Sequence, residues 1–148
     1  MIVVTLVAVI FGSSLGWVRY ERYLLQHKWE VCRTLHSKGI ELASKYPAKT
    51  ETWRGNESIN YVRMCTLYPK QDALGLSDDD ITNLITTFAD VEDVAVVDRE
   101  ISGGQLRKLA SFPKLKKMLL FNSPSKEDDL RWVKAYRPDV ELIVETRP

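Results

Sequence analysis

The stretch FPKLKKMLLFNSPSKEDDLRWV, residues 112–133, contains an aromatic residue, a short apolar run and an amphipathic segment in that order. The same order occurs earlier in FADVEDVAVVDREISGGQLRKL, residues 88–109, and begins again in YRPDVELIVE, residues 136–145, after an equal interval. Repetition of this kind is typical of architectures in which one unit cannot bury its own apolar face and must stack on its neighbours.

Each unit is predicted to form a strand, a turn and a helix. The apolar runs VAVV (94–97), MLLF (118–121) and ELIV (141–144) have the length and composition of buried strands. Asp98 and Asn122 follow the first two runs as polar turn residues, and amphipathic segments come after them. We therefore predict an α/β fold of parallel strands with backing helices over residues 76–148, with chance spacing as the alternative explanation of the period.

The N-terminal segment 1–18 has no charged side chain and would rise about 27 Å as a helix, close to the hydrocarbon thickness of a bilayer. Aromatic and basic residues then mix in WVRYERY, residues 17–23, as they do at a membrane interface. This pattern predicts a transmembrane anchor at 1–18 and a juxtamembrane helix at 19–38. A cleaved signal peptide and a buried strand are the alternatives.

The distribution of charge agrees with a membrane-proximal stem. The chain has a net charge of +1, which by itself predicts no affinity for nucleic acid, but residues 19–50 carry seven Lys or Arg against three Glu. By charge alone the following domain would lie in the cytoplasm. Basic residues upstream of Met1 would cancel this indication, so the membrane side is left open.

Residues 39–75 are predicted to be a loop-rich middle or capping segment, because Pro, Gly, Asn and Ser are frequent there. Within this segment YVRMCTLY, residues 61–68, has the alternation of a strand. The two cysteines, Cys32 and Cys65, are too few for a disulfide framework. Two separate free thiols are favoured, and a single bridge is the alternative.

The spacing Leu109-x-x-Phe112-x-x-Leu115-x-x-Met118-x-Leu120, followed by SKEDDL, resembles a leucine-rich repeat of the cysteine-containing-like form. The last segment, VKAYRPDVELIVE, resembles the ending of many short bacterial repeat proteins. The N-terminal LVAVIFGSSLGWVRYERYLLQ is similar to the anchor of planctomycete-type single-span repeat proteins. The resemblance implies a short leucine-rich-repeat-like solenoid that binds or scaffolds proteins at a membrane, with no catalytic residues.

Alternation along the strands divides their side chains between two faces. The residues expected to face the core are Val94, Val96, Met118, Leu120, Leu142 and Val144. The residues expected on the opposite face are Ala95, Val97, Leu119, Phe121 and Ile143. Because this second face is also apolar, we expect it to be covered, either by the juxtamembrane helix and the middle segment or by a protein partner.

The sequence contains no nucleophile elbow, phosphate-binding glycine loop or paired Cys and His ligands. We therefore expect a membrane-anchored protein–protein interaction scaffold that is not an enzyme and takes no cofactor, metal, nucleic acid or small-molecule substrate. The alternative is a small α/β regulatory domain resembling an anti-sigma-factor antagonist, in which Ser102 would be phosphorylated. A helix N-cap is the favoured explanation of Ser102, and strand order distinguishes the two folds.

Overall fold

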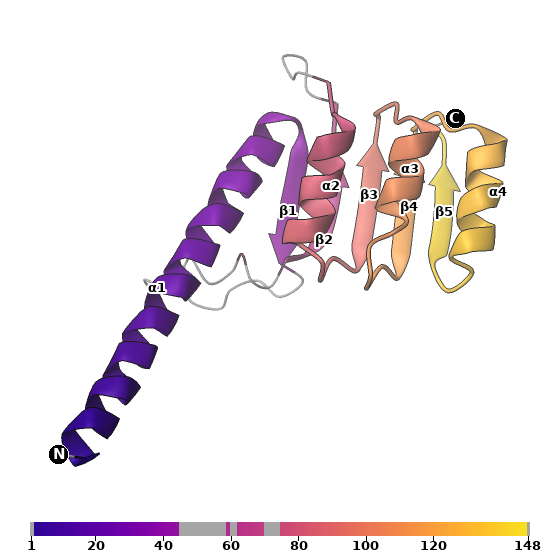
Figure 1. Cartoon of the computed structure of the whole chain (residues 1–148). Helices are drawn as coiled ribbons and strands as arrows, with labels where there is room; N and C mark the ends of the chain where they lie inside the picture. The colour runs from indigo at the N-terminus through magenta and orange to yellow at the C-terminus, as the bar shows by residue number, and fades with distance from the viewer. Residues whose placement is uncertain (1, 45–58, 60–61, 70–74, 148) are drawn as a thin grey trace.

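The computed structural model describes residues 2–44, 59, 62–69 and 75–147, with the backbone alone for residues 2–15 and 44 (Figure 1). The elements in chain order are α1 (Ile2–Ser37), β1 (Ile40–Ser44), β2 (Val62–Leu67), α2 (Asp78–Thr87), β3 (Asp93–Val97), α3 (Gly103–Leu109), β4 (Lys117–Phe121), α4 (Glu127–Tyr136) and β5 (Glu141–Glu145). The strands form one sheet in the order β1-β2-β3-β4-β5. The pair β1–β2 is antiparallel and the other pairs are parallel.

The strand register reproduces the period of the sequence. Val94 pairs with Met118, and Met118 pairs with Leu142, so the step along the chain from β3 to β4 equals the step from β4 to β5. The prediction that these three segments lie side by side and parallel is confirmed. Between β2 and β3 the step differs, because Cys65 pairs with Val94.

The helices of the described chain lie in one layer on one face of the sheet, with α1 beside α2 (Figure 1). The core fills the space between this layer and the sheet. The strand residues Val94, Val96, Met118 and Leu120 are 0–1% exposed, as predicted. The helices contribute the buried residues Leu35, Ile81, Leu84, Leu106, Leu109 and Val133.

The turns after β3 and β4 are equivalent. Asp98 and Asn122 both adopt left-handed backbone conformations, with φ of 49° and 47°, which Asp and Asn tolerate better than other non-glycine residues. The Asp98 N–H donates to the Phe121 carbonyl, and the Asn122 N–H donates to the Glu145 carbonyl. The Asn122 amide also donates to the Asp98 carboxylate. Both predicted polar turns are therefore confirmed.

The helices α2 and α3 each begin with a capping box. Ser77 accepts from the Asp80 N–H, and the Asp80 carboxylate accepts from the Ser77 N–H. Ser102 and Gln105 make the same reciprocal pair at the start of α3. Each box satisfies two N–H groups that would otherwise have no partner at the helix start. The expected capping role of Ser102 is confirmed.

The helix α1 ends at Ser37, one residue before the predicted end at residue 38, and Gly39 follows with a φ of 81° that favours glycine. No helix in the described part of the chain is both long and apolar enough to cross a membrane. Most of the predicted anchor at 1–18 falls on residues 1–15, whose side chains lie outside the described residues. Cys32 in α1 and Cys65 in β2 are both free, which confirms the favoured interpretation.

The sequence did not indicate β1, which lies in the segment predicted to be rich in loops. Ile40 and Leu42 face the core side and pair with Leu67 and Cys65, but two alternating apolar residues are a weak signal of a strand. The predicted strand at 61–68 is confirmed as β2. Residues 45–58 of the predicted middle segment lie outside the described residues.

Candidate interaction surface

The sheet face opposite the helices is called the open face here. Its predicted residues are Ala95, Val97, Leu119, Phe121 and Ile143, and all five are half-buried. Ala95, Leu119 and Ile143 pair across three strands and form one apolar row. Val97 and Phe121 form a second row beside it. The structure thus brings all five residues together on one surface.

The juxtamembrane helix does not cover the open face, which corrects its part of the expected intramolecular cover, whereas most of the middle segment lies outside the described residues. Its last turns pack in the opposite layer, where α1 contacts α2 and β1. Leu35 is 1% exposed there, and Leu25 and Val31 pack against the same core. The apolar side of α1 therefore packs against α2 and against the side of β1 that faces the helix layer. Within the described residues, no helix lies over the open face.

Charged side chains border the apolar rows of the open face. Asp93, Lys117 and Glu141 pair in register across β3, β4 and β5, with 3.9 Å between the Lys117 ammonium and the Glu141 carboxylate. At the other end, the Arg147 guanidinium lies 5.5 Å from the centre of the Phe121 ring. Arg147 also pairs with Asp98 at 3.9 Å. The surface is therefore an apolar stripe between polar ends.

Val144 departs from its predicted burial. It pairs with Leu120 and so belongs to the helix-facing side, but it is 46% exposed, and Leu142 is half-buried. The reason is that β5 is the outermost strand, so its core side is covered from one flank alone. The alternation was predicted correctly, whereas burial at the edge of the sheet was not.

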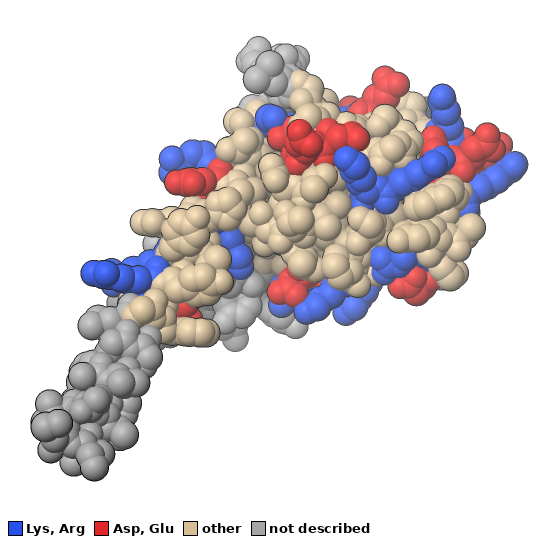
Figure 2. Space-filling model, viewed as in Figure 1, with Lys and Arg blue, Asp and Glu red and all other residues tan. Residues whose placement is uncertain are grey.

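Basic residues at the start of β4 are paired with acids one unit earlier. The Lys114 ammonium lies 2.5 Å from the Asp90 carboxylate, and the Lys116 ammonium lies 3.0 Å from Glu92. The hydrogen bond from Lys114 lowers the pKa of Asp90. Figure 2 shows the same mixture of signs over both ends of the helix layer. These lysines therefore join neighbouring units and do not form a separate basic patch.

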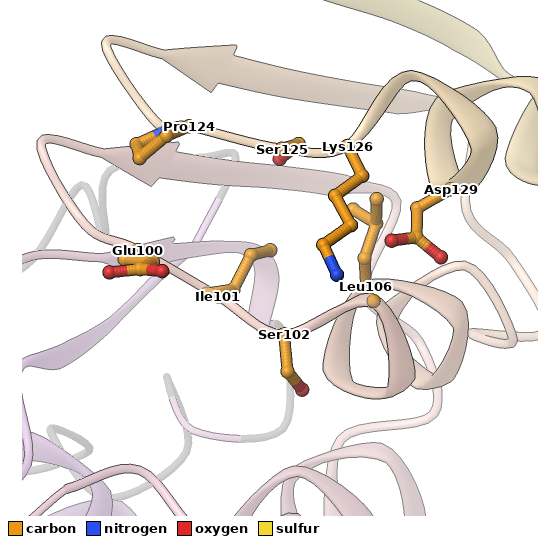
Figure 3. A pocket seen from close by; sticks show the side chains of 9 residues that line it. Glu100, Ile101, Ser102, Leu106, Pro124, Ser125, Lys126 and Asp129 are labelled. Carbon is orange, nitrogen blue, oxygen red and sulfur yellow. The ribbon is translucent and has the colours of Figure 1, made fainter.

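A hollow of about 460 Å³ lies between the loops that follow β3 and β4 (Figure 3). The Lys126 side chain points into the hollow between the loops. Glu100 lies at the other end of the hollow. Ser102 accepts the capping hydrogen bond of α3, and Asp129 pairs with Arg107 at 3.0 Å. The lining residues form no nucleophile–base pair. The sequence signal for this hollow is the position of both loops at the carboxyl ends of parallel strands.

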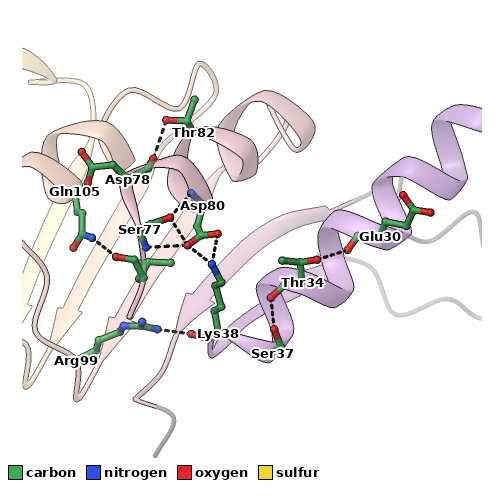
Figure 4. Close-up of polar contacts among 11 residues, drawn as sticks. Glu30, Thr34, Ser37, Lys38, Ser77, Asp78, Asp80, Thr82, Arg99 and Gln105 are labelled. Atoms are coloured by element: carbon green, nitrogen blue, oxygen red, sulfur yellow. Dashed lines mark hydrogen bonds and ion pairs between the residues drawn. The ribbon is translucent and has the colours of Figure 1, made fainter. Parts of the chain in front are cut away.

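A second polar cluster joins α1, α2 and the loop after β3 (Figure 4). The Lys38 ammonium donates to both Asp80 carboxylate oxygens at 2.7 Å. Arg99 donates to the carbonyls of Lys38 and Tyr68 at 2.8 and 3.0 Å. Burial raises the pKa of Asp80, but the hydrogen bonds from Lys38 and Ser77 outweigh it and lower that pKa overall. This cluster fixes the end of α1 against the sheet domain.

No group of three or more His, Cys, Asp or Glu residues within the described ranges is arranged to hold a metal ion. Cys65 is fully buried, and this burial raises the pKa of its thiol well above its usual value. Burial also raises the pKa of Cys32. A raised pKa keeps a thiol protonated and poorly nucleophilic, so both cysteines are suited to packing.

The chain was compared with protein-family models, with curated proteins and with solved structures, and none of them matches it.

Proposed function

We propose that this protein is a non-catalytic protein–protein interaction module, built as a short leucine-rich-repeat-like solenoid and held at a membrane by residues 1–18. The observation that carries the proposal is the open face, where the apolar row Ala95–Leu119–Ile143 crosses three parallel strands with no described helix over it. Contiguous apolar surface between polar ends is typical of protein-binding sites.

Three features support the solenoid interpretation. The strands follow one another in sequence order, and β3, β4 and β5 keep a constant spacing along the chain. The turn residues Asp98 and Asn122 adopt the same conformation. Consecutive strand order also favours a solenoid over the alternative regulatory domain, for which we expect a mixed order. In a solenoid each unit contacts its neighbours alone, and the strand-lined face presents similar positions repeatedly.

The membrane role rests on the N-terminal segment and the residues that follow it. In Figure 1, α1 extends away from the sheet, so its N-terminal part is separate from the domain core. Trp17, Tyr20 and Tyr23 are 63%, 56% and 66% exposed, which suits contact with lipid headgroups. Cell fractionation with protease digestion of intact and lysed cells tests the anchor and the side of the domain together. Recovery of the full chain in the soluble fraction would contradict the anchor.

The open face is tested with two neighbouring substitutions. Phe121→Asp places a carboxylate on the open face, whereas Leu120→Asp places one in the core, where Leu120 is 0% exposed. We expect Phe121→Asp to fold, with a loss of about 1 kcal/mol of unfolding free energy, and Leu120→Asp to unfold. Unfolding of both variants, measured by circular dichroism, would mean that the open face is core.

Partner binding is tested by photo-crosslinking in the native membrane. A photoreactive residue at position 119 should give one discrete adduct, and the same residue at Lys134, an exposed position on α4, should give none. The adduct at position 119 should disappear when Phe121→Asp is added. An equal yield from both positions, or persistence of the adduct with Phe121→Asp, would contradict a partner on the open face.

A further inference from the structure

The outer edge of β5 is a second surface that is independent of the apolar rows of the open face. Within the described residues, β4 is the sole neighbour of β5 in the sheet. The Arg147 side chain, which follows β5, reaches Asp98 and the Phe121 ring on the side of β4, away from this edge. The edge therefore offers its backbone and side chains to another strand.

The backbone groups of β5 alternate between the inner and the outer side. The Glu141 N–H donates to the Lys116 carbonyl, and the Glu145 carbonyl accepts from the Asn122 N–H. These residues therefore face β4 with their backbone groups. In a parallel ladder the intervening residues point the other way, so Leu142 and Val144 direct their N–H and carbonyl groups outward.

The side chains at this edge specify the chemistry of an added strand. Val144 is 46% exposed and Leu142 is half-buried on the helix-facing side, so an added strand would complete their burial. Glu141 and Glu145 are exposed at the two ends of the strand. Along the row that ends at Glu141 the charge alternates from Asp93 to Lys117 to Glu141. The next strand would continue this alternation with a cation.

A second copy of this chain is a poor match for the same edge. If two β5 strands paired antiparallel in the register centred on Ile143, which pairs the most residues, each Glu141 would lie opposite the other copy's Glu145. Like charges directly opposite each other destabilise a strand pair. The two glutamates therefore oppose self-association and favour a basic strand.

We propose that the outer edge of β5 binds an extended basic segment of a partner protein by strand addition. The segment carries one Lys or Arg opposite Glu141 and another opposite Glu145. Its two intervening positions that face the helix layer are apolar and cover Leu142 and Val144. Backbone hydrogen bonds to Leu142 and Val144 provide the pairing, and the two cations provide the selectivity.

The test uses the full chain in mild detergent and two synthetic peptides with the cores Lys-Val-Ile-Val-Lys and Glu-Val-Ile-Val-Glu. We expect the basic peptide to bind at least about tenfold more tightly by fluorescence anisotropy, since two opposite-charge pairs replace two like-charge pairs. Binding should slow amide hydrogen exchange at Leu142 and Val144. The double variant Glu141→Lys/Glu145→Lys should reverse the preference, so that the acidic peptide binds more tightly.

The matched control is Glu127→Lys/Asp128→Lys, which changes the same charge on the exposed start of α4 and should leave the preference unchanged. Failure of both peptides to bind at millimolar concentration would overturn the proposal. Equal binding of the two peptides, or protection of amides elsewhere than at β5, would overturn it as well. Val97→Asp, on the open face two strands away from β5, should not affect peptide binding, so this outcome is separable from that of the open face.

Discussion

Arg137 shows how one side chain holds two successive units together. Its guanidinium donates to the carbonyls of Ala110, Phe112 and Leu115, which follow α3, at 2.9–3.0 Å. It also pairs with Asp139 at 2.9 Å, and this hydrogen bond raises the pKa of Arg137. The side chain is 16% exposed. Arg137 thus donates to backbone carbonyls of the segment that joins α3 to β4.

We expect Arg137→Ala to lower the unfolding free energy by about 2–3 kcal/mol, because the three carbonyls lose charge-assisted hydrogen bonds. Arg131→Ala is the control, since Arg131 is 69% exposed and pairs with Glu127 within one helix. Such a pair contributes about 0.3–0.5 kcal/mol. Urea denaturation measures both variants, and similar losses for the two would contradict the role assigned to Arg137.

Two adjacent glycines at the start of α3 differ in what surrounds them. A Cβ atom at Gly103 would overlap the Asp129 carboxylate, which Arg107 holds in place. At Gly104 the nearest atom to such a Cβ would be the Ser102 hydroxyl at 3.8 Å, an ordinary contact. Close packing of α3 against α4 therefore needs a glycine at the first position and not at the second.

Gly103→Ala should destabilise the protein by about 1–2 kcal/mol, since Asp129 must move away from its partner. Gly104→Ala should stabilise it by about 0.5–1 kcal/mol, because alanine favours a helix more than glycine does. Thermal unfolding of both variants provides the measurement. The packing argument would fail if Gly103→Ala also raised the midpoint temperature.

At the scale of elements, the contact between the end of α1 and the start of α2 contains a charged residue, Asp80, that is largely buried. Asp80 is 7% exposed and accepts hydrogen bonds from Lys38 and Ser77. Its pKa is lower in the folded chain than in the unfolded chain, so the unfolded state binds a proton more readily. The stability that Asp80 contributes is therefore complete above its unfolded pKa of about 3.9, and is lost as the pH falls through the folded pKa.

Asp80→Asn should reduce the unfolding free energy by about 2 kcal/mol at pH 7, since Lys38 loses a charged partner and α2 loses its capping box. The variant should also lose less stability than the wild type as the pH falls from about 5 to about 2. Asp79→Asn, at an exposed position in the same turn, is the control. Parallel pH profiles for Asp80→Asn and the wild type would contradict this assignment.

At the scale of the whole molecule, α1 has two parts with different relations to the rest. Leu25, Val31, Cys32 and Leu35 pack against the core, whereas Trp17, Tyr20 and Tyr23 are exposed. The second half of the helix is thus part of the domain. The boundary predicted at residue 38 therefore separates segments that share one core.

Removal of residues 1–18 should leave the midpoint of thermal unfolding unchanged within about 2 °C, because the backbone of α1 extends away from the sheet towards its N-terminus (Figure 1) and, among the side chains described, Leu25 is the first of α1 to pack against the core. Removal of residues 1–38 should cost at least about 2–5 kcal/mol, since it deletes Leu35, which is 1% exposed, together with Lys38. Differential scanning calorimetry of the two truncated chains measures both midpoints. Equal midpoints would mean that α1 is dispensable to the domain.

The parts of the fold that could be predicted from sequence are those that recur. Alternation and a fixed period predict the strands β3, β4 and β5 and the open-face residues on them. They also predict the turns at Asp98 and Asn122. The strand β1 and the exposure of Val144 could not be predicted, because both depend on which strand lies at an edge. The hydrogen bonds of Arg137 and Lys38 join residues far apart in sequence, so no local sequence pattern predicts them.

The constant spacing of β3, β4 and β5 along the chain has a consequence for how such a chain can change in length. If one full period were duplicated or deleted, each remaining strand would still pair with an equivalent strand. The same side chains would still point inward. A gene of this type can therefore grow or shrink by recombination in whole modules without redesign of the interior. Each added module would widen the open face by one strand and would add one more interface between neighbouring units to the stability of the whole.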